Sequence, residues 1–134
     1  RYAGNKTLKC AFNVYNNSND NKSYTNQILP LNSEEFDIGN NYDTSTYKFT
    51  APVKGVYVLS WKAFSNNVTN NPGNRICIVV ANNGYQNYGE NENYTIVTLM
   101  NSGDTAYVNV TGTVSLYMGA KHTVFSGCLI REIP

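Results

Sequence analysis

The chain has 134 residues, only 14% of them charged, and a formal net charge of +1 at pH 7. This length suits one domain, residues 1–134, that buries its own core, and the near-neutral charge argues against nucleic acid as a partner. No apolar run approaches the roughly 20 residues that cross a bilayer, so we expect no membrane insertion. Abundant Asn and 11 Tyr, with little Ala, Leu or Glu, favour strands and Asn-rich turns over helices.

The first third of the chain alternates between strand-like and polar segments. Residues 8–15 predict a strand with alternating apolar side chains, and residues 16–26 predict an Asn-rich loop. A short extended piece then leads through Glu34 and Glu35 to Phe36. Two adjacent acids on an extended chain point apart, so this pair favours a solvated turn over a pair of catalytic acids.

The central part of the chain, residues 42–64, predicts a strand, a Pro-containing connection and a longer strand. In the longer strand, alternating side chains form two rows that are both apolar at their N-terminal end: Tyr57, Leu59, Trp61 and Ala63 in one, Val56, Val58 and Ser60 in the other. A strand with one wet face would alternate apolar and polar residues, so we expect this one to be covered on both faces. The second sheet of a sandwich would cover one row, and another copy of the chain would cover the other.

The second half of the chain contains five further strand-like segments: 75–81, 94–100, 104–111, 113–118 and 123–131. A long turn at 65–74 precedes them, and Asn82, Asn83 and Gly84 end the first of them. About eight to ten short strands without a helical stretch indicate an antiparallel all-β sandwich.

The sequence carries no recognisable catalytic motif. Its single histidine, His122, has no Cys or carboxylate at motif spacing, and such a residue is more often a solvated loop side chain than a general base. No nucleotide-binding loop, nucleophile elbow or His/Cys metal set occurs. We therefore expect a protein that is not an enzyme.

A binding function fits the segment from Asn82 to Tyr94, which combines flat aromatic rings with amides and carboxylates. Sugars are bound by such a combination, because an apolar ring face stacks on Tyr while hydroxyls bond amide and acid groups. We therefore expect Tyr85, Asn87 and Tyr88 to contact a glycan. The alternative is that this loop only reflects an Asn- and Tyr-rich protein.

An anionic sugar such as a sialic acid would need a further group that binds its carboxylate. Cations and good hydrogen-bond donors serve this purpose. The candidates outside the strand interiors are Arg75, Lys121 and His122.

Cysteines and glycosylation sequons give further expectations. Three cysteines leave at least one unpaired within a monomer, and Cys77 lies in an apolar run that makes it most simply a core thiol. Six Asn-x-Ser/Thr sequons begin at Asn5, Asn16, Asn21, Asn67, Asn93 and Asn109. Those in loops are the better glycan acceptors if a eukaryote secretes the protein, whereas Asn109 lies inside a predicted strand.

Six spaced residues resemble the pattern of the C1q globular head, in the C1q/tumour necrosis factor superfamily: Asp37, Tyr42, Phe49, Gly55, Tyr57 and Leu59. Leu59 stands where the family usually has Phe or Tyr, and Leu31 stands where it has Phe, so both departures keep apolar character. Three more segments resemble the family's first strand, its Gly-Asp strand start and its closing strand: 11–13, 103–108 and 123–130. The matches are in order and cover nearly the whole chain.

The resemblance implies a ten-stranded antiparallel jelly roll that assembles as a homotrimer. Its core or its contacts between copies are expected to include Tyr57, Leu59, Trp61, Phe125 and Leu129. In this fold the first and last strands are antiparallel neighbours, which implies a disulfide between Cys10 and Cys128, with two small buried thiols as the alternative. Several members bind calcium near the threefold axis, which implies Ca²⁺ at Glu90 and Asn91, with a solvated loop acid as the alternative.

Two classes of function are compatible with the resemblance. One is a secreted, extracellular recognition module whose trimer binds glycans or microbial surfaces in innate defence, because several weak sugar sites on one surface reinforce one another. The other is a structural or signalling trimer that binds a protein or matrix partner, as cerebellin- and collagen-type relatives or the caps of bacterial and phage fibres do. Binding that sugars inhibit would distinguish the first class, which we favour, from the second.

Overall fold

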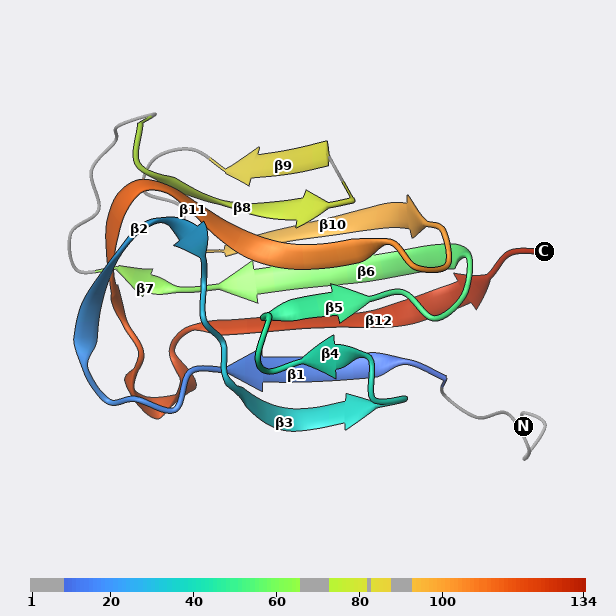
Figure 1. Cartoon of the computed structure of the whole chain (residues 1–134), viewed down its shortest axis with the longest axis horizontal. Coiled ribbons are helices and arrows are strands. Elements are labelled where there is room, and N and C mark those ends of the chain that lie inside the picture. Colours follow the sequence, from blue (N-terminus) through green and yellow to red (C-terminus); the bar gives the residue numbers. More distant parts are fainter. Residues whose placement is uncertain (1–8, 66–72, 82, 88–92) are drawn as a thin grey trace.

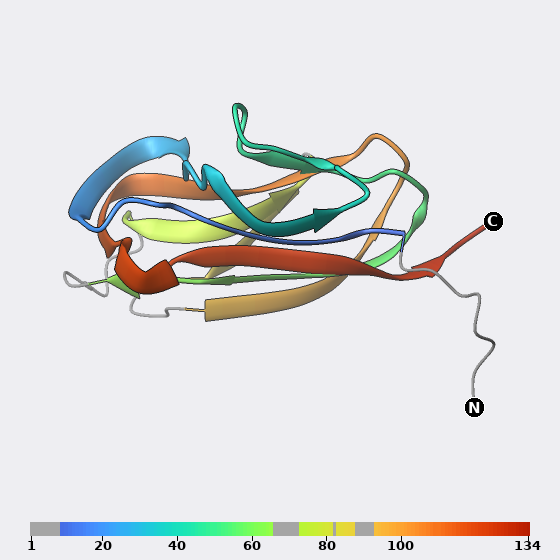
Figure 2. The same ribbon diagram turned by 90° about the horizontal axis from the view of Figure 1, so that it is seen from below.

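The computed structural model describes residues 9–65, 73–81, 83–87 and 93–134. Two antiparallel β-sheets lie face to face, as the face view (Figure 1) and the edge view (Figure 2) show. One sheet has five strands and the other has seven. The expected antiparallel all-β sandwich is therefore confirmed.

The five-stranded sheet has the order β10-β6-β12-β1-β3. These strands span Asn93–Met100, Gly55–Lys62, Val124–Glu132, Ala11–Tyr15 and Ser33–Ile38, respectively. The central strand, β12, pairs with β6 on one side and with β1 on the other. The last strand of the domain, β12, thus lies between the first strand, β1, and β6 from the middle of the sequence.

The seven-stranded sheet has the order β4-β5-β11-β8-β9, and β2 and β7 both pair with β11. Its strands, in chain order, span Asn21–Ile28, Tyr42–Asp43, Lys48–Thr50, Phe64–Ser65, Arg75–Val80, Asn83–Asn87 and Thr105–Tyr117. A short 3-10 turn, η1 (Gly119–Lys121), leads from β11 to β12. Strands β3 and β4 lie along one edge of the sandwich, and β9 and β10 lie along the other (Figure 1).

Three of the strands lie where polar composition predicted loops or a turn. Strands β2, β3 and β9 have the sequences NKSYTNQI, SEEFDI and NGYQN. In β2 only Tyr24 is buried, so the strand is fixed by its pairing with β11 and not by a continuous apolar face. Polarity alone therefore does not identify loops in this chain.

A single long strand, β11, replaces the two strands expected at 104–111 and 113–118. Gly112 lies at its centre with a φ of +74°, and its N–H donates to the Asn26 side-chain oxygen at 2.8 Å. A Cβ atom on this residue would lie 2.0 Å from the carbonyl oxygen of Gly73. Only glycine therefore lets the strand continue through this irregularity.

The core between the sheets is built around aromatic rings. The ring centroid of Phe12 lies 4.6 Å from that of Phe49 and 5.0 Å from that of Phe125. Phe49 also meets the edge of Tyr57, at a centroid distance of 5.9 Å. Such offset and edge-to-face contacts add to the free energy gained by burying the rings.

Several residues that carry the family resemblance have structural roles. The carboxylate of Asp37 accepts the backbone N–H groups of Asn41 and Tyr42, at 3.1 and 3.0 Å, and so closes the turn between β3 and β4. The hydroxyl of Tyr42 donates to the carbonyl of Leu31 at 2.8 Å. Asp104 accepts the N–H of Asn101 at 2.9 Å before β11 begins.

Gly127 of β12 illustrates how closely this core is packed. A Cβ atom on this residue would lie 2.7 Å from Leu59 Cδ2, 2.8 Å from the carbonyl oxygen of Val58 and 3.0 Å from Phe12 Cε1. A side chain of any size would therefore displace either the backbone of β6 or the aromatic cluster.

Candidate functional site

The two rows of β6 have different surroundings. Tyr57, Leu59 and Trp61 are each at most 2% exposed and lie between the sheets, as does Phe125 of β12. Leu129 is partly buried and packs against the same cluster. Tyr57, Leu59, Trp61 and Phe125 therefore belong to the core, which is one of the two roles expected for this set, and Leu129 lies at the margin of the core. The second sheet covers this row of β6.

The opposite row of β6 faces away from the seven-stranded sheet, on the side that we call the outer face. Val58 lies in register with Val97 of β10 and with Cys128 of β12, and Val56 lies in register with Leu99. Val56 and Val58 are only partly buried. The protomer thus covers the apolar residues on the reverse side of this strand only in part.

Strand register places four of the five exposed large hydrophobic side chains of the described residues on the outer face, and the fifth, Ile130, lies at the bulge of β12. The five are Phe36 (45% exposed), Ile38 (42%), Val97 (65%), Leu99 (55%) and Ile130 (55%). Phe36 and Ile38 belong to the outer face because they pair with Asn13 and Ala11, which pair with Ser126 and Cys128. Monomeric soluble proteins rarely expose a continuous apolar surface of this kind.

The outer face also contains a shallow recess of about 410 Å³, which we call the apolar recess. It is lined by Ala11, Phe12, Phe36, Val58, Ser60, Thr95, Ser126, Gly127 and Cys128. Its polar members lie together, and the hydroxyls of Ser60 and Thr95 are 2.9 Å apart. The outer face is therefore apolar near Leu99 and becomes polar toward the start of β10.

The predicted disulfide between Cys10 and Cys128 is wrong, because all three cysteines are free. Cys128 pairs with Ala11, so Cys10 is one residue out of register with it. Neighbouring positions on a strand point to opposite faces, which places Cys10 in the core and Cys128 on the outer face. Burial raises the pKa of the Cys10 thiol to about 11 and also raises the pKa of Cys77.

The glycan-binding residues expected in the 82–94 segment are only partly described. Tyr85 and Asn87 lie in β9, where they pair with Ile78 and Ile76 of β8. Tyr88 and the two calcium candidates, Glu90 and Asn91, lie outside the described residues. Arg75 begins β8 next to this pairing, so the structure brings it to the same end of the sandwich as Asn87.

Lys121 and His122 lie on the other side of the sandwich. Lys121 makes an ion pair with Glu35 of β3, and its ammonium group lies 4.9 Å from the ring centroid of Tyr15. The hydrogen bond to Glu35 raises the pKa of Lys121. The ring of His122 lies 5.3 Å from that of Tyr117. Lys121 is therefore held against β3 of the five-stranded sheet, whereas Arg75 begins β8 of the seven-stranded sheet.

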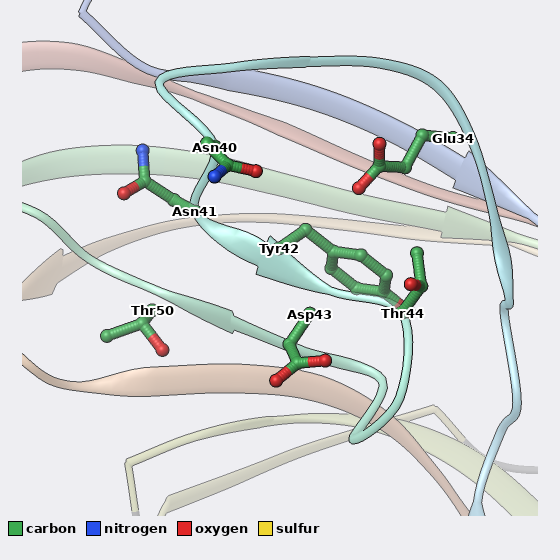
Figure 3. A pocket seen from close by; sticks show the side chains of 7 residues that line it. All are labelled: Glu34, Asn40, Asn41, Tyr42, Asp43, Thr44 and Thr50. Atoms are coloured by element: carbon green, nitrogen blue, oxygen red, sulfur yellow. The ribbon is translucent and has the colours of Figure 1, made fainter.

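A second recess, which we call the edge recess, lies where β3, β4 and β5 meet (Figure 3). It has a volume of about 460 Å³ and is lined by Glu34, Asn40, Asn41, Tyr42, Asp43, Thr44 and Thr50. Glu34 and Asn40 lie on one side of Tyr42 in Figure 3, and Asp43 and Thr50 lie on the other. Sequence reasoning missed this site because its residues come from three strands and form no motif.

The sequons differ in accessibility. Asn16 is only 7% exposed, and its side chain is held at both ends: Nδ2 donates to the carbonyl of Pro30 and Oδ1 accepts the N–H of Ser18. The prediction of Asn16 as a glycan acceptor is therefore wrong for the folded chain. Asn21 and Asn93 are exposed and Asn109 is half-buried, whereas Asn5 and Asn67 lie outside the described residues.

One family model and several solved structures are similar to this chain. A model described as C1q domain matches residues 11–130, and no match was found among curated proteins. The globular domain of zebrafish complement 1qA is 18% identical, with a TM-score of 0.64 over 93% of this chain and 99% of that one. Pika GITRL is 12% identical, with a TM-score of 0.65 over 96% and 100% of the two chains. Murine APRIL is 11% identical, with a TM-score of 0.64 over 90% and 98%.

Proposed function

Because the chain belongs to the C1q domain family, whose domains are typically trimeric recognition modules, we propose that it is a secreted homotrimer that binds carbohydrate in innate defence. Proteins with C1q domains are commonly extracellular. No helix among the described residues is long and apolar enough to cross a membrane. Recognition without catalysis is part of the same proposal.

The outer face of the five-stranded sheet carries the proposal of assembly. Its four exposed hydrophobic side chains lie on β3 and β10, and the cross-strand row of Ala11, Cys128 and Val58 connects them into one surface. Covering such side chains gains about 25 cal/mol for each Å² of apolar surface removed from water. Two further copies of the chain are the occupants that family membership supports.

The carbohydrate part of the proposal rests on polar chemistry outside the outer face. The described surface offers many amides and hydroxyls and few ion pairs, which suits neutral hydroxyl-rich ligands better than highly charged polymers. A single sugar site of this kind is weak. Three sites on one trimer would bind a glycan-coated surface far more tightly than one.

Sedimentation velocity of the pure chain tests the assembly. We expect a single species of three times the 14.9 kDa protomer mass at micromolar concentration. Parallel runs with and without EDTA test the proposed calcium at Glu90 and Asn91, because loss of a structural ion would lower the sedimentation coefficient. A monomer at all concentrations, in both buffers, would rule out the proposed trimer.

A glycan array followed by haemagglutination inhibition tests the ligand class. We expect binding that free monosaccharides or short glycans inhibit. A trimer that binds no glycan, yet captures a defined protein or matrix component, would instead place the chain in the structural or signalling class.

A further inference from the structure

Hydrogen bonds within the protein order the walls of the edge recess. The Asp37 carboxylate holds the N–H groups of Asn41 and Tyr42, and the N–H of Thr50 donates to the carbonyl of Asn41 at 2.9 Å. On the other side of the recess, Asp43 Oδ1 accepts from the N–H and the hydroxyl of Ser45, at 2.8 and 2.6 Å. These bonds order the walls before any ligand arrives, which lowers the entropy cost of binding.

Several polar groups of the edge recess are left without a hydrogen-bond donor or acceptor among the described residues. They are the Asn40 amide, Asp43 Oδ2 and the hydroxyls of Thr44 and Thr50. The Glu34 carboxylate also lines the recess and makes a side-chain hydrogen bond with Asp37, which leaves it further acceptor positions for a ligand. Together they supply acceptors from the acids, and both donors and acceptors from the amide and the hydroxyls. In Figure 3 they surround the ring of Tyr42, whose own hydroxyl is used by Leu31.

The charge of the edge recess restricts what can bind there. Its lining contains two carboxylates and no Lys or Arg. Lys48, which pairs with Asp43 across the strands, instead lies 5.1 Å from the ring centroid of Tyr107. Burial and the neighbouring Asp37 carboxylate raise the pKa of Glu34. An anionic ligand would therefore be repelled, and a lipid or aromatic ligand would find too little apolar surface.

We infer that the edge recess binds one neutral sugar residue, through paired hydrogen bonds from the sugar hydroxyls to Glu34, Asn40 and Thr50. A sugar hydroxyl donates and accepts at once, which matches the mixed inventory of this lining. A hydrogen bond that a hydroxyl donates to a carboxylate is also stronger than one between neutral groups. The volume of about 460 Å³ lies within the usual range for small-ligand sites.

This inference rests on the proposed carbohydrate function and makes it more specific. It assigns neutral sugars to the edge formed by β3 and β4, far from the end of β8 where Arg75 lies. A sialic acid, if the protein binds one, would have to bind elsewhere. Neutral and anionic glycans would then occupy different parts of the molecule.

Chemical-shift mapping on the ¹⁵N-labelled full chain tests the inference directly. The probes are D-glucose, D-galactose, D-mannose and N-acetyl-D-glucosamine, each titrated to millimolar concentration, with N-acetylneuraminic acid as the anionic comparison. We expect at least one neutral sugar to shift the amide signals of Asn40, Thr44 and Thr50. N-acetylneuraminic acid should leave those signals unchanged.

Substitutions in the recess make the test quantitative. Glu34→Gln and Thr50→Val together remove one charged acceptor and one hydroxyl while keeping side-chain size. The glutamine amide can still hydrogen-bond Asp37, and the Thr50 hydroxyl makes none of the bonds that order the walls. We expect the affinity for the neutral sugar to fall at least tenfold, because each lost hydrogen bond to a charged group is large on this scale. Glu35→Gln is the matched control, since Glu35 is the next residue and bonds Lys121 instead. It should leave the affinity unchanged.

The possible failures are distinguishable. Sugar binding that maps to other residues and survives Glu34→Gln with Thr50→Val would overturn the edge recess while leaving carbohydrate recognition intact. Absence of binding to every glycan of the array, with a normal spectrum, would overturn both. The circular dichroism spectrum and the thermal midpoint of each variant must match those of the parent chain. If Glu34→Gln with Thr50→Val changes either of them, Thr44→Val takes the place of this pair in the same titration.

Discussion

The two sheets of the sandwich present different chemistry to their surroundings. The outer face of the five-stranded sheet exposes Phe36, Val97 and Leu99, whereas the far side of the seven-stranded sheet carries paired hydroxyls. There, Ser23 meets Ser115 at 3.1 Å and Thr25 meets Thr113 at 2.9 Å, across β2 and β11. Both sheets obey the same alternation along their strands. The outward residues alone therefore separate the apolar surface that we propose to contact copies of the chain from the polar surface of the other sheet.

The largest expected effect comes from placing charge on the apolar side of this comparison. Val97→Glu with Leu99→Glu should convert the trimer to a monomer at micromolar concentration, because carboxylates left unpaired in a dry contact cost several kcal/mol each. Sedimentation velocity measures the change. The matched control is Ser23→Glu with Thr25→Glu on the hydroxyl side, which should leave the trimer intact. Equal behaviour of the two pairs would contradict the assignment of the outer face.

A smaller effect is the difference in unfolding free energy between substitutions in the two rows of β6. In the monomeric Val97→Glu, Leu99→Glu background, Leu59→Ala should lower the free energy of unfolding by about 2–5 kcal/mol, since it leaves a cavity between the sheets. Val58→Ala, one residue away on the outer face, should lower it by less than about 1 kcal/mol. Urea denaturation followed by Trp61 fluorescence measures both. A similar loss for the two substitutions would mean that the outer row is buried within the protomer.

Gly127 of β12 lies in register with Leu59 of the core row, and Gly127→Ala should cost about 1–3 kcal/mol of unfolding free energy through overpacking. The added methyl group would lie 2.7 Å from Leu59 Cδ2 and 2.8 Å from the backbone oxygen of Val58. Ser126→Ala, the neighbouring position on the outer face, is the control and should cost under about 0.5 kcal/mol. The same urea titration measures this pair, and a neutral Gly127→Ala would show that β12 can shift.

Thiol chemistry gives the smallest and most local effect. In the monomeric background at pH 8, a thiol reagent should label Cys128 within minutes and leave Cys10 and Cys77 unmodified, because both are buried. In the trimer, Cys128 should be protected as well. Rapid labelling of Cys128 in the trimer, detected by mass spectrometry of peptides, would place that part of the outer face in water.

The same thiols predict a loss of stability at alkaline pH. The pKa of Cys10 rises from 9.0 to about 11 on folding, because burial disfavours the thiolate. The unfolded chain therefore loses this proton first, and the free energy of unfolding should fall as pH rises from about 9 toward 11. Cys10→Ala should reduce the slope of that decline, measured by urea denaturation at each pH. An unchanged slope would exclude Cys10 as its source.

Sequence reasoning succeeded where the pattern was local. The two apolar rows around Tyr57 and Val58 predicted a strand covered on both faces, and the structure confirms that one row lies in the core. Asp37, Tyr42 and Gly127 revealed the family because each serves a turn or a close contact that few other residues can make.

It failed where tertiary pairing overrides composition. Strands β2 and β9 are polar enough to resemble loops, and they are strands because β11 and β8 offer them backbone partners. The disulfide prediction placed two neighbouring strands correctly but missed the one-residue offset that sends Cys10 and Cys128 to opposite faces. The edge recess could not be predicted at all, because no sequence pattern connects Glu34, Asp43 and Thr50 before the strands are placed.

The position of β12 has a consequence for how the protein is made. Of the strands of this domain β12 is the last to be synthesised, yet it fills the gap between β1 and β6 in the middle of its sheet. Until it emerges, both neighbours present unpaired backbone edges that can join strands of other nascent chains. We therefore expect productive folding of this domain to wait until β12 has been synthesised, and a truncation just before Val124 to yield aggregates in place of a smaller domain.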